Sequence, residues 1–192
     1  MTIDADFLVI GAGVVGLSLG VELCNEFPRS KVVVIDKEEK LGAHASGRNS
    51  GVLHAGFYYS PDSLKARFCR EGNTELRKLI NDYEIPIKAI GKVVIAKNKQ
   101  EADMLDSLYR RGLKNGVELD LLPESDLKSF EPLARTYEKF LWSPNTAVSD
   151  PVKVLLALAT KFETEGGTLL LAKKVSVLED GSVWVDSKRA KI

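Results

Sequence analysis

The chain contains little cysteine. Only Cys24 and Cys69 occur among its 192 residues, and neither belongs to a Cys-x-x-Cys pair. Two such distant cysteines cannot supply the dense disulfide framework of a small secreted domain, and their spacing from the two histidines does not match a zinc site. We therefore expect no metal centre and a reducing compartment.

The chain also lacks net charge and a long apolar run. Its 27 lysines and arginines balance 27 aspartates and glutamates, so no net basic field is available to hold nucleic acid. The longest apolar runs, around residues 7–10 and 154–159, are far shorter than the roughly 20 residues of a membrane-spanning helix. The acidic start Met1–Asp6 is unlike a signal peptide. We expect no nucleic-acid partner, no transmembrane span and a cytoplasmic location, with peripheral membrane association as an alternative.

What remains is the composition of an ordinary globular protein. Apolar residues make up 44% and charged residues 28% of the sequence, and a chain of this length can bury a sizeable core. The first 36 residues predict one βαβ unit. Phe7–Ile10 is a short apolar run that ends in glycine, Val14–Phe27 has apolar residues at helical spacing, and Lys31–Asp36 is a second buried strand.

The rest of the chain predicts further alternation of helices and strands. We expect helices at residues 62–83, 99–115, 123–130 and 151–162, and strands at residues 93–96, 140–142 and 168–172. Residues 175–178 and 183–185 flank an Asp-Gly turn and predict a hairpin. Residues 37–59, by contrast, lack periodicity, and so long a loop within a compact domain usually has a function.

The loop after the first strand matches the dinucleotide-binding fingerprint. Gly11 permits a tight turn, Gly13 lets bare backbone approach a pyrophosphate, and Gly16 lets the helix pack closely on the strand. The N–H groups at the start of the helix then attract the phosphates. Asp36 is the twentieth residue after Gly16 and ends the second strand, where a carboxylate can accept hydrogen bonds from a ribose. The fingerprint alone does not separate FAD from NAD.

The segment that follows carries a resemblance. It is rich in small and polar residues and contains both histidines of the chain, His44 and His54. The sequence resembles the FAD-dependent oxidoreductases of the D-amino-acid oxidase and glycerol-3-phosphate dehydrogenase type, most of all the L-2-hydroxyglutarate dehydrogenases and oxidases. The resemblance is carried by Asn49–Tyr59, Ser63–Ala66, Phe68–Cys69, Gly91–Lys92, Glu131–Pro132 and Ser149–Pro151.

The resemblance implies an α/β protein with a Rossmann-like FAD-binding fold and part of a second, mixed-sheet substrate domain. Residues 1–83 would begin the FAD-binding domain, residues 84–148 would form the partial substrate domain, and residues 149–192 would return to the first. The cofactor-binding residues would be Gly11, Gly13, Val14, Gly16, Asp36, Lys37, Ser46, Gly47, Asn49, Ser50, Gly51 and Val175. Such enzymes are about twice as long, so the chain is expected to be a fragment that turns over poorly alone.

The resemblance also places His54 near the flavin. A neutral imidazole can remove the hydroxyl proton of an alcohol while hydride leaves carbon for flavin N5. His54 could instead only hydrogen-bond the backbone or the flavin, or could anchor the flavin covalently. Arg48 could meet a substrate carboxylate, as could Lys65 or Arg67, although a solvated surface charge is the simpler interpretation of any one of them. Tyr58 could cap the pocket, or its ring could pack in a core.

The resulting hypothesis is an oxidoreductase that converts a 2-hydroxy acid, such as L-2-hydroxyglutarate, to the 2-oxo acid and passes electrons to oxygen or a quinone. One alternative is a flavoenzyme that oxidises an amino acid or glycerol 3-phosphate. Arg48, which stands where the relatives tend to carry histidine, keeps this alternative open. Another alternative is an inert nucleotide-binding module.

Overall fold

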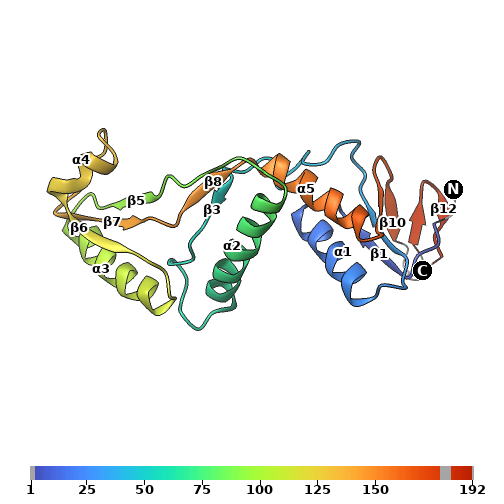
Figure 1. Ribbon diagram of the computed structural model, residues 1–192, viewed down its shortest axis with the longest axis horizontal. Helices are drawn as coiled ribbons and strands as arrows, with labels where there is room; N and C mark the ends of the chain where they lie inside the picture. Colours follow the sequence, from blue (N-terminus) through green and yellow to red (C-terminus); the bar gives the residue numbers. More distant parts are fainter. Residues whose placement is uncertain (1–2, 178–182, 192) are drawn as a thin grey trace. The chain divides into compact units, whose positions relative to one another are not determined.

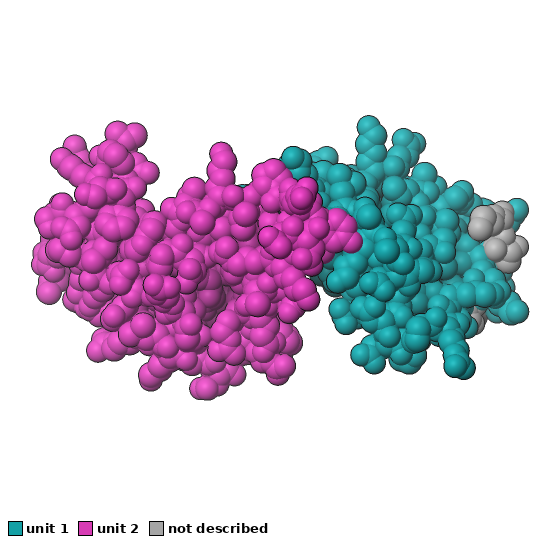
Figure 2. All heavy atoms as spheres, in the orientation of Figure 1, with its two compact units in different colours: residues 1–50, 150–192 teal, residues 51–149 magenta. Residues whose placement is uncertain are grey.

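The computed structural model describes residues 3–177 and 183–191, and it divides the chain into two compact units (Figure 2). Unit 1 comprises Met1–Ser50 and Asp150–Ile192, and unit 2 comprises Gly51–Ser149. Residues 51–83, which the sequence analysis assigned to the first domain, thus lie in unit 2. The reason is that the side chains of their helix donate hydrogen bonds to Asn115 and Asn145, and their short strand pairs with residues 147–148, all within unit 2.

Unit 1 is built on a parallel sheet with helices packed on it (Figure 1). Its strands β1 (Phe7–Ile10), β2 (Val32–Ile35) and β9 (Thr168–Leu170) lie in the order β1-β2-β9. In register, Phe7 lies opposite Val32 and Val33 opposite Thr168. All residues of β2 are buried, as expected for a central strand covered on both faces. The predicted α/β, Rossmann-like fold class is confirmed.

Two helices cover one face of this sheet and pack against each other: α1 (Val14–Glu26) and α5 (Pro151–Thr164). α5 begins as predicted, because Pro151 occupies its first turn and the Asp150 carboxylate accepts hydrogen bonds from the N–H groups of Val152 and Lys153. The core between these helices and the sheet consists of Ala12, Leu17, Val21, Cys24, Val32, Val34, Leu155, Ala159 and Phe162. On the other face Ile3, Ala5, Val33, Ile35 and Val185 form a second cluster.

A small antiparallel sheet completes unit 1. It joins β10 (Val175–Val177), β11 (Val183–Val185) and β12 (Lys188–Arg189). Val175 pairs with Val185, which confirms the predicted hairpin pairing, whereas the predicted Asp-Gly turn lies outside the described residues.

Unit 2 contains two three-stranded sheets. One joins β3 (Val52–Leu53), β8 (Ala147–Ser149) and β4 (Ile87–Lys88), and the other joins β5 (Lys92–Ile95), β7 (Lys139–Ser143) and β6 (Asp120–Pro123). Every strand pair described in this unit is antiparallel, whereas a mixed sheet was expected there. Ile87 of β4 lies opposite Ser149 of β8 and Lys92 of β5 opposite Ser143 of β7, so the described strands of this unit have antiparallel neighbours on every paired edge.

The helices of unit 2 are α2 (Leu64–Asp82), α3 (Lys99–Lys114), the short 3₁₀ helix η1 (Glu124–Asp126) and α4 (Leu127–Phe130). Ser63 caps α2 and Asn98 caps α3 through their side-chain oxygens. α3 packs on β6 and β7 around a core of Ala55, Phe57, Ala96, Ala102, Leu105, Val117, Leu119 and Leu141. In the described part of the chain, no helix combines the length and the apolar character that crossing a membrane requires.

The close packing of α1 gives a stability prediction. A Cβ on Gly20 would lie 2.8 Å from a Val34 methyl carbon and 2.9 Å from the Phe162 ring. We expect Gly20→Ala to lower the free energy of unfolding by about 1 kcal/mol, because overpacking outweighs the better helix propensity of alanine. The matched control is Gly72→Ala in α2, where a Cβ meets nothing within 4 Å. Gly72→Ala should raise the free energy of unfolding by up to about 1 kcal/mol. Urea unfolding measures both, and equal stabilisation by the two variants would contradict the packing.

Candidate FAD site and the histidine segment

The glycine loop forms a tight turn between β1 and α1. Gly11 has a φ of +107°, which favours glycine, and its N–H donates to the Ile35 carbonyl of the neighbouring strand at 2.7 Å. A Cβ on Gly16 would overlap the Gly11 carbonyl oxygen. The first and third glycines of the fingerprint therefore have the roles predicted for them, a turn and a close helix contact.

The beginning of α1 is open to an anion. The residue before the helix is Gly13, which offers no side chain to cap it, and the first turn contains no acidic residue. The Ser46 hydroxyl, from the loop after β2, accepts a hydrogen bond from the Val14 N–H at 3.0 Å. A Cβ on Gly13 would lie 2.9 Å from this hydroxyl oxygen. Small residues thus keep bare amides and a hydroxyl together at the positive end of the helix, an arrangement suited to phosphate.

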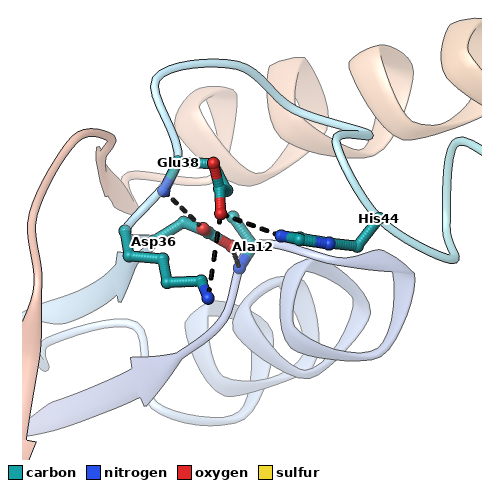
Figure 3. A network of polar contacts seen from close by, with 5 residues as sticks. Ala12, Asp36, Glu38 and His44 are labelled. Atoms are coloured by element: carbon teal, nitrogen blue, oxygen red, sulfur yellow. Dashed lines mark hydrogen bonds and ion pairs between the residues drawn. The ribbon is translucent and has the colours of Figure 1, made fainter.

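Asp36 lies directly beside this turn, as Figure 3 shows. One carboxylate oxygen accepts from the Ala12 N–H at 2.7 Å, and the other accepts from the Glu38 N–H at 2.9 Å. The backbone of Asp36 is fixed by β9, because the Asp36 N–H donates to the Leu170 carbonyl at 2.9 Å. The half-buried carboxylate is held in one orientation by two amides, and each oxygen keeps a further lone pair for a ligand hydroxyl.

Glu38 and His44 form a second polar pair next to Asp36. His44 Nε2 lies 2.8 Å from a carboxylate oxygen of Glu38 (Figure 3). The Lys37 ammonium lies 3.8 Å from the same oxygen. The His44 and Lys37 side chains are exposed. Sequence reasoning assigned no role to Glu38 and left His44 as a loop residue. A carboxylate two residues beyond the ribose-binding position, followed by a histidine six residues later, is the only sequence signal for this pair.

The loop that supplies Ser46 is held by its own hydrogen bonds. The Asn49 amide donates to the carbonyls of Ala45 and Ser46 at 3.1 and 3.0 Å. A Cβ on Gly47 would overlap the backbone of Gly42. The structure therefore gives Asn49 and Gly47 a part in shaping the loop, whereas Arg48 is exposed on it.

The predicted site residues divide between the units. Unit 1 brings Gly11, Gly13, Val14, Gly16, Asp36 and Ser46 together around the turn, and it also contains Lys37, Gly47, Arg48, Asn49, Ser50 and Val175. Unit 2 contains Gly51, His54 and Tyr58. No group of acidic, cysteine and histidine side chains suited to a metal ion occurs among the residues that the structure describes.

The backbone of residues 54–59 is fixed by long side chains from two helices. The Asn73 amide of α2 donates to the His54 carbonyl at 3.0 Å. The Asn115 amide, at the end of α3, donates to the carbonyls of Gly56 and Tyr59, both at 3.0 Å, and Arg111 donates to the Tyr58 carbonyl at 2.9 Å. Sequence reasoning missed these three side chains, because they lie 19 to 59 residues from the carbonyls that they bind.

His54 has the electrostatic surroundings of a neutral base. Although the residue is exposed, neighbouring protein atoms partly desolvate its ring, and this lowers its pKa below the ordinary 6.5. Repulsion from the Lys92 ammonium lowers the pKa further. The imidazole is therefore uncharged at neutral pH and is able to accept a proton.

Comparison with known proteins places this geometry in a family. Residues 6–191 match the family described as FAD dependent oxidoreductase. The chain belongs to this family. The match confirms the family resemblance expected from the sequence. It also confirms the fold class and FAD as the cofactor of the family.

Relatives within the FAD dependent oxidoreductase family are similar over nearly the whole chain. L-2-hydroxyglutarate dehydrogenase from Indibacter alkaliphilus is 38% identical over 92% of this chain and 44% of its own length. The mitochondrial L-2-hydroxyglutarate dehydrogenase of Homo sapiens is 36% identical over 93% of this chain and 38% of its own length. The chain thus spans less than half the length of these curated relatives.

Solved structures of other oxidases share the fold. L-alpha-glycerophosphate oxidase from Mycoplasma pneumoniae, a structure with FAD bound, superposes with a TM-score of 0.80 at 26% identity, over 98% of this chain and 52% of the oxidase. Glycine oxidase from Geobacillus kaustophilus superposes with a TM-score of 0.84 at 21% identity, over 99% of this chain and 54% of the oxidase. The second similarity shows the fold alone.

The lowered pKa of His54 gives a second prediction. In an NMR titration, the His54 imidazole should lose its proton with a midpoint below 6.5, because desolvation and Lys92 disfavour the charged form. Since the unfolded chain binds this proton more tightly, His54 should reduce stability as the pH falls from 6.5 through the folded-state pKa. The chain has two histidines, so the variant His44→Gln leaves one signal and assigns it. A midpoint at or above 6.5 would contradict the predicted neutral base.

Proposed function

We propose that the chain is the FAD-binding part of an oxidoreductase that oxidises L-2-hydroxyglutarate, or a closely similar 2-hydroxy acid, to the 2-oxo acid. The observation that supports this most strongly is the Asp36 carboxylate, which is hydrogen-bonded to the Ala12 amide at the mouth of α1. The substrate class is taken from the names of the relatives that match most of this chain. Activity, substrate and electron acceptor of the whole protein are parts of this proposal.

The residues around the glycine loop fit the adenosine half of FAD. The open beginning of α1 and the Ser46 hydroxyl would bind the pyrophosphate, and Asp36 would accept hydrogen bonds from the ribose. Further contacts are proposed for Gly11, Gly13, Val14, Gly16, Lys37, Gly47, Asn49, Ser50, Gly51 and Val175. When bound, FAD supplies the acceptor for a hydride.

For the reaction itself we propose that neutral His54 takes the hydroxyl proton of the substrate. Its imidazole has the charge state for this role, and its backbone is held by Asn73. Arg48 would bind a substrate carboxylate and Tyr58 would cover the substrate. Oxygen or a quinone would then receive the electrons. A cytoplasmic location, with or without peripheral membrane contact, stays a prediction.

A second candidate is oxidation of glycerol 3-phosphate. The similarity to the glycerophosphate oxidase at 26% identity favours it, because that protein has the same fold and its structure contains bound FAD. The relatives of higher identity nevertheless make the 2-hydroxy acid the first choice.

Binding of FAD tests the first half of the proposal. Asp36→Asn should weaken FAD binding about tenfold or more, because the charged acceptor for the ribose is lost. Asp6→Asn is a matched control, since the Asp6 carboxylate also accepts a backbone hydrogen bond, from Lys31 at 2.7 Å, but precedes β1 at the opposite end of the strand from the glycine loop. Quenching of flavin fluorescence on titration measures both affinities. Equal affinities for the two variants would remove Asp36 from the cofactor site.

Reduction of the bound flavin tests the second half. Under anaerobic conditions L-2-hydroxyglutarate should bleach the yellow protein, and the D enantiomer at the same concentration serves as the control. His54→Gln should slow bleaching by roughly two orders of magnitude or more, the typical contribution of a general base. Bleaching by glycerol 3-phosphate and not by L-2-hydroxyglutarate would establish the second candidate instead.

A further inference from the structure

The architecture of unit 2 brings Lys92 to the same end of β8 as His54. In β8, Ala147 pairs with Leu53, the residue before His54. The neighbouring Thr146 carbonyl accepts a hydrogen bond from the N–H of Gly91, the residue before Lys92, at 3.0 Å. Two segments nearly forty residues apart in the sequence therefore meet at one point of the sheet.

The backbone at Lys92 is firmly placed. Lys92 opens β5 and pairs with the fully buried Ser143 of β7, whose hydroxyl lies 3.1 Å from that of Thr146. Gly91 has a φ of +66°, and a Cβ on it would overlap the Trp142 ring. Glycine is thus required just before the lysine, and no larger residue can occupy this position without a shift of Trp142.

The ammonium of Lys92 lies over aromatic rings and lacks an acidic partner. It is 4.6 Å from the centroid of the Tyr58 ring and 5.8 Å from that of Phe57. Lys92 is half-buried, and in the part of the chain that the structure describes it forms no ion pair with a carboxylate. Cation–π contacts hold the amine in place but leave its positive charge uncompensated.

We propose that the Lys92 ammonium, held over the Tyr58 and Phe57 rings, binds a carboxylate of the 2-hydroxy acid next to His54. The inference rests on the proposed function and adds a specificity residue to it. A cation at this point selects an anionic substrate, and a carboxylate bound to it places the neighbouring hydroxyl carbon near the imidazole. The bound anion also offsets the repulsion that Lys92 exerts on a protonated His54.

The test uses glutarate, a dicarboxylate without a hydroxyl group that cannot be oxidised, and the FAD-loaded chain. In NMR titrations glutarate should raise the pKa of His54 in the unaltered protein. Lys92→Met should raise this pKa by itself, should abolish the further effect of glutarate, and should weaken glutarate binding about tenfold. Lys92→Arg keeps the charge and should retain binding, so loss in the methionine variant alone reports on charge and not on folding.

Two controls separate the possible outcomes. Lys97→Met removes an exposed lysine just after the same strand and should leave the glutarate affinity and the His54 pKa unchanged. Sodium sulfate at equal ionic strength measures general screening. Equal glutarate affinity in the unaltered protein and in Lys92→Met, or no effect of glutarate on His54, would overturn the inference. If glutarate binds through Lys92 but L-2-hydroxyglutarate does not bleach the flavin, the anion site stands and the proposed function fails.

Discussion

The hydrogen bond between the Asp36 carboxylate and the Ala12 amide joins the two halves of the βαβ unit at the point where a nucleotide would bind. It requires β1 and β2 to be parallel neighbours, so that the carboxyl end of each strand lies at the same edge. It also requires the glycine turn, because a side chain at Gly16 would overlap the Gly11 carbonyl oxygen and force α1 away. Strand register, turn and helix packing together thus fix the position of the Asp36 carboxylate.

The same interaction suits the proposed site to a dinucleotide. An aspartate turned toward the beginning of a helix places a negative charge close to amides that attract anions. The two amides that bind Asp36 partly satisfy this charge, while the amide of Val14, two residues after Ala12, donates to the neutral Ser46 hydroxyl. A ligand with a diol and a phosphate separated by a few bonds matches this arrangement, in which the Asp36 carboxylate accepts from the diol and the amides at the beginning of α1 donate to the phosphate. A simple phosphate would meet only the donors.

Sequence reasoning predicted unit 1 better than unit 2, and the reason is physical. In unit 1 the signals are local: a buried strand, a glycine turn and a helix follow each other within β1 and α1, and the predicted bounds agree with the structure to within about a residue. In unit 2 the two-residue strands β3 and β4 are too short to show alternation, and they exist only because β8 lies between them. The boundary at Ser50 was missed for the same reason, since β3 is held by a partner almost a hundred residues later.

The site residues follow the same division. Asp36 and the glycines were found because their spacing is fixed by one supersecondary unit. His54 was proposed from its chemistry and from the resemblance. The side chains that hold its segment, Asn73, Arg111 and Asn115, are polar residues on or at the end of helices and look like ordinary surface positions in the sequence. Their role depends on tertiary contacts that no local pattern encodes.

The ends of unit 2 explain how the chain can hold so large a segment between β2 and β9. The Ser149 N–H donates to the Gly51 carbonyl at 2.9 Å, so the residues at which the chain enters and leaves unit 2 are adjacent. Asp150 then caps α5 at once, and α5 leads to β9, which pairs in parallel with β2. Unit 2 is therefore inserted between β2 and α5 of a β-α-β crossover, and the crossover keeps its ordinary geometry. Unit 2 can bring His54 and Lys92 together within its own sheets, while the strands of unit 1 fix Asp36 independently.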